Sequence, residues 1–236
     1  MMPIKLRSKK KQNISIMQKE SNSISSEQLR TIRTSIQFAS TEKLRTMVVT
    51  SPEPGAGKSF ISMNLAISFA EQGNKVLLID ADLRRPTVHT TLRLSNELGL
   101  SNYLAGQGKL EECLQEITMH ENLFVISSGI IPPNPAELLS SNKMKEFVQI
   151  VSNMFDIVIF DAPPVLPVVD PLIIGNMVDG LILVLRSEHT DQSDAVQTLD
   201  KIKQSKIKMI GAVLNGRKNR GDSYKTVYYT KKSKVN

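Results

Sequence analysis

The sequence predicts one α/β domain built on a doubly wound, mostly parallel sheet. Two short, wholly apolar runs, 76–79 and 157–160, have the composition of strands that are covered on both faces. Further strands are expected at 124–127, 181–185 and 209–214, with helices near 135–152 and 190–205. Strands that alternate with helices are typical of a parallel sheet. A chain of 236 residues with 40% hydrophobic content can bury the core of one such domain.

The distribution of charge divides the chain into three segments. We predict a basic flexible N-terminal segment over 1–24, a folded domain over 25–215 and a flexible basic tail over 216–236. Residues 1–11 carry five basic groups and no acidic ones, and the tail carries seven against Asp222, so with a net charge of +7 the middle of the chain is acidic. Basic charge confined to tails is not typical of a nucleic-acid-binding face, so no nucleic-acid partner is expected. One interpretation is that the basic tails are simply solvated. The other is that they are attracted to an anionic lipid surface or to an acidic protein surface.

Cysteine and hydropathy patterns predict a cytoplasmic protein. The single cysteine, Cys113, excludes an internal disulfide and is expected in the core. There is no apolar run of eighteen residues, and no hydrophobic segment follows the basic start, so neither a membrane span nor a secretory signal is expected. The three histidines, His89, His120 and His189, lack partners at ligand spacing and are expected to be structural or surface residues.

The stretch 46–59 has the pattern of a strand, a glycine-rich turn and the first turn of a helix. Gly55 and Gly57 let the backbone curl with its N–H groups facing inward, and a helix that begins near Lys58 adds the positive end of its dipole. The segment matches the end of the phosphate-binding motif G-x-x-x-x-G-K-[ST]. In that motif the lysine reaches the β- and γ-phosphates and the hydroxyl, here that of Ser59, binds Mg²⁺.

Three aspartates follow the two buried runs. Asp80 and Asp82 are two residues apart, so both side chains point into the crevice where open α/β sheets bind ligands. Asp161 ends the second run in the same way. Each acid alone fits a solvated strand end, but together with a phosphate loop the three predict a Mg²⁺–nucleotide site.

Residues 25–39 are expected to form a helix with one apolar stripe. Glu27, Arg30 and Arg33 lie on a second stripe, displaced from the first by about 140° at 100° per residue. This polar stripe fits a solvated face with an internal Glu27–Arg30 ion pair, and it also fits a contact with a neighbouring subunit.

The tyrosines are unevenly distributed. Tyr224, Tyr228 and Tyr229 crowd the last thirteen residues, and Tyr103 is the only other tyrosine. The polar, Lys-rich sequence around the three cannot bury enough surface to order itself, so packing does not account for them. Phosphorylation of these tyrosines, or their recognition by a partner, would account for their presence.

Together these features resemble the bacterial tyrosine kinases of capsule and exopolysaccharide synthesis, in the form found in Gram-positive bacteria. The resemblance spans nearly the whole chain. It rests on 54–59 as the Walker A loop, 77–84 as the Walker A′ motif and 157–161 as Walker B, with the Glu-x-x-Arg-x-x-Arg helix and the tyrosine-bearing tail. It implies a P-loop NTPase fold of the deviant-Walker, MinD/ParA-like group. Two positions depart from the pattern: Pro52 stands at the first motif glycine, and Phe60 where threonine often follows the serine.

The resemblance implies an ATP-dependent protein-tyrosine kinase that phosphorylates its own tail in trans and regulates exopolysaccharide or capsule synthesis. ATP and Mg²⁺ are the implied cofactors. Lys58 would hold phosphates and Asp80 would accept the proton of the tyrosine hydroxyl, although Asp80 and Asp82 can exchange roles. The implied nucleotide-binding residues are Gly55, Ala56, Gly57, Lys58, Ser59, Phe60 and Asn215, and the implied Mg²⁺ residues are Ser59, Asp82 and Asp161.

The resemblance also implies partners. The helix of Glu27, Arg30 and Arg33 would assemble a ring, an octamer in this family. A membrane-spanning activator would recruit the chain to the membrane, and protein-tyrosine substrates and a cognate tyrosine phosphatase are expected. The implied phosphosites are Tyr224, Tyr228 and Tyr229.

The alternative class is a MinD/ParA-like ATPase that acts as a nucleotide-switched scaffold. Those proteins carry a second lysine where this chain has Glu53, and they reach membranes with a C-terminal amphipathic helix. Residues 223–236 show no apolar period of that kind. A nucleotide-regulated interaction module without turnover is a third possibility.

Overall fold

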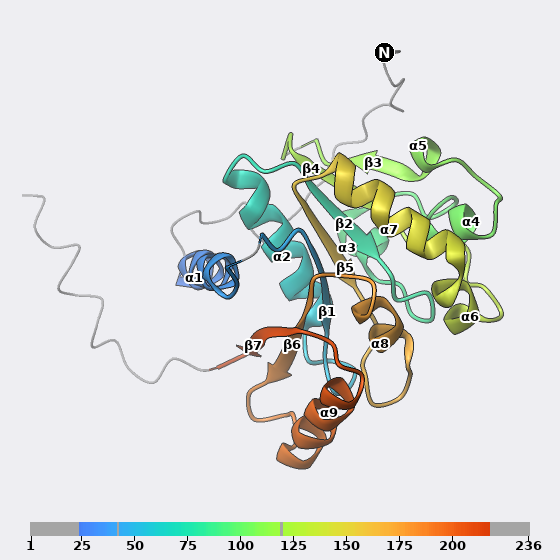
Figure 1. Ribbon diagram of the computed structural model, residues 1–236. Coiled ribbons are helices and arrows are strands. Elements are labelled where there is room, and N and C mark those ends of the chain that lie inside the picture. Colours follow the sequence, from blue (N-terminus) through green and yellow to red (C-terminus); the bar gives the residue numbers. More distant parts are fainter. Residues whose placement is uncertain (1–23, 42, 119, 218–236) are drawn as a thin grey trace, which may run out of the picture.

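The structure is a computed structural model that describes residues 24–41, 43–118 and 120–217. Helices and strands alternate along most of the chain, as predicted (Figure 1). The helices are α1 (Ile24–Phe38), α2 (Lys58–Glu71), α3 (Val88–Leu92), α4 (Leu100–Leu104), α5 (Leu110–Cys113), α6 (Pro135–Ser140), α7 (Asn142–Met154), α8 (Asp170–Gly175) and α9 (Gln192–Gln204). The strands are β1 (Thr46–Thr50), β2 (Val76–Asp80), β3 (Leu114–Glu116), β4 (Leu123–Ile126), β5 (Ile157–Asp161), β6 (Gly180–Arg186) and β7 (Met209–Asn215).

The strands form a single seven-stranded sheet in the order β3-β4-β2-β5-β1-β6-β7. All pairings are parallel except that of β3 with β4, which confirms the doubly wound, mostly parallel fold class. Asp80 and Asp161 are register partners on neighbouring strands, and Val49 lies level with Asp161 on the other side. The carboxyl ends of β2, β5 and β1 therefore meet where the chain enters the glycine-rich loop.

Buried apolar residues form one cluster on each face of the sheet. Side chains alternate along the strands: on β2, Leu78 joins the cluster that contains α1 and α2, whereas Leu77 and Ile79 join the cluster that contains α4, α6, α7, α8 and α9. Every residue of β2 and β5 is buried, which explains the continuous apolar runs that precede Asp80 and Asp161 in the sequence.

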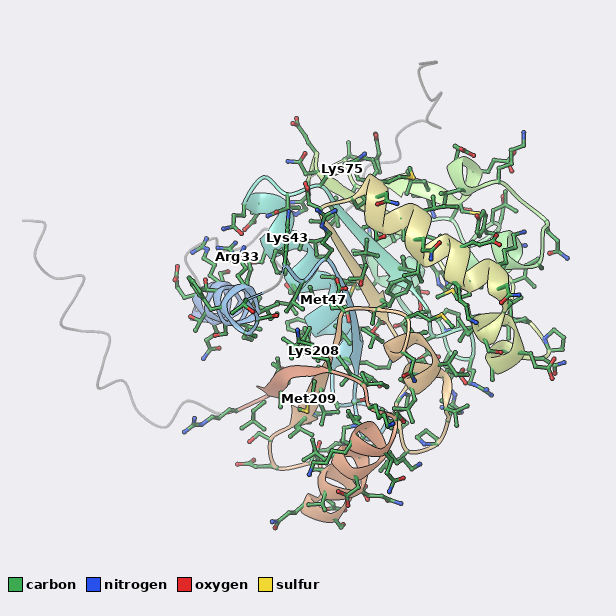
Figure 2. All side chains as sticks on the ribbon, viewed as in Figure 1. Arg33, Lys43, Met47, Lys75, Lys208 and Met209 are labelled. Atoms are coloured by element: carbon green, nitrogen blue, oxygen red, sulfur yellow. The ribbon has the colours of Figure 1, made fainter. Side chains whose placement is uncertain are left out.

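Helix α1 lies against α2 at the side of the sheet where β7 forms the edge (Figure 1). Arg33, labelled in Figure 2, reaches toward α2, where its guanidinium donates to the carbonyl oxygen of Ser68 at 2.6 Å and to the hydroxyl at 3.2 Å. Lys208, just before β7, donates to the Ser40 hydroxyl at 2.9 Å. The C-terminal half of α1 and the segment directly after it are thus tied to the domain by residues distant in sequence.

Two details of the fold differ from the sequence prediction. The expected helix near 135–152 is two helices, because Ser141 adopts extended backbone angles and its hydroxyl caps α7 by accepting from the N–H of Met144 at 3.2 Å. Strand β3 and the short helices α3, α4, α5 and α8 were not expected, since three to six residues give no readable period. Cys113 is buried, as predicted.

The predicted N-terminal segment and tyrosine tail lie outside the described residues, apart from Ile24, Gly216 and Arg217 at their borders. Within the part of the chain that the structure describes, no helix has both the length and the apolar character required to cross a bilayer.

Candidate nucleotide-binding site

The loop between β1 and α2 has the geometry of an anion cradle. Gly55 and Gly57 have φ angles of +86° and +93°, which residues with a side chain rarely adopt. Helix α2 begins directly at Lys58, and no side chain caps its N-terminus at Gly57. The first N–H groups of α2 therefore keep their hydrogen-bonding capacity for a bound anion, where the helix dipole also favours negative charge.

Asn215, at the end of β7, lies against this loop. Its amide donates to the carbonyl oxygen of Ala56 at 3.0 Å. A Cβ atom at Gly57 would lie only 2.2 Å from that amide nitrogen, so a larger residue there would displace the Asn215 amide and would also strain a backbone with a φ of +93°. The structure thus brings Asn215 to the predicted site, while its contact with an adenine base stays a prediction. Phe60, also predicted, lies exposed in the first turn of α2.

The side chain of Lys58 points at two of the three aspartates. Its ammonium lies 3.0 Å from Oδ2 of Asp82 and 3.8 Å from Oδ1 of Asp161, and it also donates to the Ser59 hydroxyl at 3.3 Å. Burial alone would lower the pKa of Lys58, but the negative charges of Asp161 and Asp82 outweigh it and the pKa is raised. Lys58 is therefore charged and neutralises the acidic side of the site.

Asp161 is fully buried and only partly satisfied. Oδ1 accepts a hydrogen bond from the Ser62 hydroxyl at 3.1 Å, whereas Oδ2 is buried and has no hydrogen-bond partner in the described part of the chain. Burial raises the pKa of Asp161, and the nearby Lys58 opposes that rise. An orphaned carboxylate oxygen of this kind fits a cation.

The donor set suits Mg²⁺ bound together with phosphates. Among the described residues, no three carboxylate, histidine or cysteine side chains form a complete metal cage. Mg²⁺ commonly uses only one or two carboxylates plus phosphate and water oxygens. Asp82, Asp161 and the hydroxyl of Ser59 meet that requirement beside the cradle.

Asp80 is held by the main chain. Its Oδ1 accepts from the N–H of Asp82 at 3.2 Å, and its Oδ2 accepts from the N–H groups of Thr87 and Val88 at 3.1 and 3.0 Å. Burial, followed by the charge of Asp161, raises the pKa of Asp80 to about 7. A carboxylate with this pKa can exchange a proton near neutral pH.

Several residues at the site were not found from the sequence. Ser62 lies one turn after Lys58 on α2, so helical spacing gave a usable signal for it. Thr87 has no such signal, although its hydroxyl donates to that of Ser59 at 3.2 Å. The guanidinium of Arg84 forms a two-point ion pair with the buried Asp170, with N–O distances of 2.8 and 3.1 Å, and so joins the loop after β2 to the start of α8.

A second group of contacts holds the start of the glycine-rich loop. Glu53 accepts a hydrogen bond from the hydroxyl of Thr190 at 2.6 Å, and Arg186 donates to the carbonyl oxygen of Gly55 at 3.1 Å. Glu53, which stands where the MinD/ParA class has its second lysine, therefore links this loop to the segment after β6. Glu53 thus has an intramolecular role in this chain.

The fold and the phosphate loop define a P-loop nucleotide-binding protein, and residues 44–211 match the AAA domain family. The chain is 46% identical over 213 residues to the tyrosine-protein kinase YwqD of Bacillus subtilis, covering 90% of both chains. It is 35% identical to the putative tyrosine-protein kinase CapB of Staphylococcus aureus, covering 80% of this chain and 83% of that protein. The chain belongs to the bacterial tyrosine-protein kinases of the capsule and exopolysaccharide type.

Solved structures agree with this assignment. The chimerical protein CapA2B2 superposes with a TM-score of 0.84 at 33% identity, covering 88% of this chain and 91% of that one. The kinase domain of the Escherichia coli tyrosine kinase ETK gives 0.78 at 36% identity, covering 84% and 79%. Some relatives are much longer: the match to the tyrosine-protein kinase ptk of Acinetobacter johnsonii covers 88% of this chain but 28% of that protein. The septum site-determining protein MinD of Pyrococcus horikoshii, at 24% identity and a TM-score of 0.63 over 74% of this chain and 72% of that one, shares the fold.

Proposed function

We propose that this chain transfers the γ-phosphoryl group of ATP to tyrosine hydroxyls, first of all to those of its own tail in a neighbouring subunit. The observation that carries the proposal is the convergence of Lys58 with Asp80, Asp82 and Asp161 beside an uncapped helix N-terminus. Phosphoryl transfer needs positioning and charge stabilisation more than covalent help from the protein, and this arrangement supplies both.

The residues of the loop have separable tasks. The N–H groups of 55–59 bind the phosphates, and Lys58 exchanges its contact with Asp82 for a contact with a phosphate when the nucleotide enters. Ser59, Asp82 and Asp161 would hold Mg²⁺, which supplies positive charge to the phosphate oxygens. Asn215, whose amide donates to the carbonyl oxygen of Ala56 in the loop, would contact the base of the nucleotide.

The proton of the attacking tyrosine goes to Asp80. A tyrosine hydroxyl has an ordinary pKa of about 10, and a nearby carboxylate can accept its proton as the bond to phosphorus forms. The pKa of Asp80, about 7, suits this exchange. Asp82 is the alternative base, because it lies two residues further out from the strand and borders the same crevice.

The acceptors we propose are Tyr224, Tyr228 and Tyr229, which lie outside the described residues. Filling all three adds roughly −5 of charge, at about −1.5 to −2 each, to a tail that carries seven basic groups and one acidic group. A basic tail is attracted to the acidic crevice of a neighbouring subunit, and a phosphorylated tail is not. Phosphorylation in trans would therefore also weaken the assembly.

The proposed setting is the cytoplasmic face of a membrane, where the kinase regulates capsule or exopolysaccharide synthesis. A separate membrane-spanning activator would recruit it there, and the structural likeness to the chimerical protein CapA2B2 supports a second protein component. Subunits would assemble through the outer side of α1 into a ring, an octamer in this family. A cognate tyrosine phosphatase would reverse the modification, and other protein tyrosines would serve as further substrates.

Mixing two variants tests transfer in trans. Lys58→Met retains the tail tyrosines but lacks the phosphate-binding lysine, and the triple Tyr224→Phe, Tyr228→Phe, Tyr229→Phe variant retains the site but lacks the acceptors. Neither should gain phosphotyrosine in its tail when incubated alone with Mg²⁺–ATP. In the mixture, the Lys58→Met chain should become labelled. A Lys58→Met tail that stays unlabelled beside an active partner contradicts transfer in trans.

A further inference from the structure

Phe38, the last residue of α1, is an unusual surface residue. Its side chain is 84% exposed, the most exposed of the large hydrophobic residues in the described part of the chain. Exposed phenyl rings on a folded helix are costly to hydrate, and large aromatic side chains are enriched at protein interfaces. The position of Phe38 on α1 therefore indicates which surface of the helix is available to a partner.

The outward face of α1 contains Phe38 and Glu27. The two residues are eleven positions apart, which places them within about 20° of each other around the helix. The buried residues Leu29 and Ile36 lie on the opposite side. Arg33 lies only about 60° from Ile36, which explains why its guanidinium bonds inward to Ser68 of α2.

A shallow apolar groove lies beside this face, between α1 and the edge strand β7. Its volume is about 160 Å³, and its lining includes Ile32, Ile36, Ile182, Ile210, Gly211 and Val213. Within the described chain β7 pairs only with β6, so the groove is at the edge of the sheet. Phe38 is not part of the lining, and its exposure shows that it does not fill the groove of its own chain.

The groove has the size and chemistry of a receptor for a phenyl ring. An apolar cavity of about 150 Å³ accommodates benzene. Each chain thus presents the highly exposed phenyl group of Phe38 and an apolar groove of matching volume, and such a pair on one molecule fits a contact between two copies. We propose that Phe38 of one subunit inserts into the groove between α1 and β7 of a second copy of this chain.

This inference adds a specific contact to the proposed assembly. Its relevance to phosphorylation in trans rests on the proposed function. It replaces a contact based on three charged residues with one based on an apolar anchor. Glu27 and Arg30, which form an exposed ion pair on the outward side, would lie at the rim of this contact. Arg33 would act indirectly by holding α1 in place on α2.

Two variants separate the two halves of the contact in the full-length protein. Phe38→Ala removes the phenyl group and leaves the groove. Gly211→Leu places a bulky side chain on the groove lining, and its Cβ meets no atom within 4 Å. Val196→Ala, at an exposed apolar residue of α9, is the matched control. Sedimentation velocity gives the assembly size, and nucleotide binding and the melting temperature report on the fold of each variant.

We expect wild type and Val196→Ala to self-associate, and Phe38→Ala and Gly211→Leu each to weaken association about thirtyfold or more, as loss of an interface anchor does. An equimolar mixture of the two variants should form 1:1 pairs, because it contains one intact phenyl group opposite one intact groove. Monomeric wild type at tens of micromolar, or wild-type assembly of either variant, overturns the inference. A lower melting temperature for Gly211→Leu with unchanged assembly also overturns the inference, because it indicates that residues of the same chain fill the groove. Tyrosine phosphorylation is measured separately, so its absence counts against the kinase proposal alone.

Discussion

The ammonium of Lys58 lies 3.0 Å from Oδ2 of Asp82, a residue 24 positions further along the chain. The same lysine is 3.8 Å from Asp161, so one cation serves two buried acids. Under the proposed function, a phosphate of the nucleotide would replace these acids as the partner of Lys58, and Asp82 and Asp161 would then be free to hold Mg²⁺. Binding of phosphate and of Mg²⁺ should therefore be coupled through this one side chain.

That coupling predicts different effects for the three aspartates. Asp82→Asn and Asp161→Asn should each lower the affinity for Mg²⁺–ATP, because both remove charge that faces the metal. Asp80→Asn should stop phosphoryl transfer while it retains more of the nucleotide affinity. Calorimetric titration of the three variants with Mg²⁺–ATP, beside a phosphotyrosine assay, makes the comparison. Equal losses of affinity in all three would remove the distinction between base and metal ligands.

The raised pKa of Asp80 predicts how stability depends on pH in metal-free protein. Between about pH 4 and pH 7 the folded state retains a proton that the unfolded state has lost, so the free energy of unfolding falls as pH rises through this range. The slope for one proton is at most about 1.4 kcal/mol per pH unit. Asp80→Asn should reduce this slope, and the raised pKa of Asp161 should leave a residual slope of the same sign. Urea unfolding across the range, with EDTA present, measures the slope, and a wild-type stability that rises from pH 4 to 7 contradicts the assignment.

Arg33 and Glu27 should behave differently although the sequence places them on one stripe. Arg33→Ala removes two hydrogen bonds to Ser68 and should cost about 1–3 kcal/mol of stability. Glu27→Ala removes one member of an exposed ion pair and should change stability by less than about 1 kcal/mol. Chemical denaturation of the two variants tests this at a protein concentration where both are monomeric. Equal stabilities of the two variants would contradict the inward contact of Arg33 with Ser68 and would indicate that Arg33 belongs to the outward face of α1.

Local sequence patterns were sufficient for the phosphate loop and its three aspartates. Motif glycines, apolar strands and acids at strand ends encode these features within a few residues of each other. The contact between Arg33 and Ser68 joins residues 35 positions apart, and that between Thr190 and Glu53 joins residues 137 apart. Contacts of this kind depend on how α1 and the segment after β6 pack against the rest of the domain. The hydrophobic periodicity of the sequence around each residue therefore does not predict them. The break at Ser141 was missed although the sequence carried a local signal for it, because Ser140, Ser141 and Asn142 are residues that favour helix caps over helix interiors.

Phosphotyrosine formed on the purified full-length chain tests the central claim most directly. Wild type incubated with Mg²⁺–ATP should gain phosphate at Tyr224, Tyr228 or Tyr229, as mapped by mass spectrometry. Lys58→Met, with its fold verified by circular dichroism, should be slower by about 10²–10³, because it lacks the charge that faces the transferred group. Equal rates of phosphorylation in wild type and Lys58→Met, or phosphate absent from tyrosine in the wild type, would contradict the account.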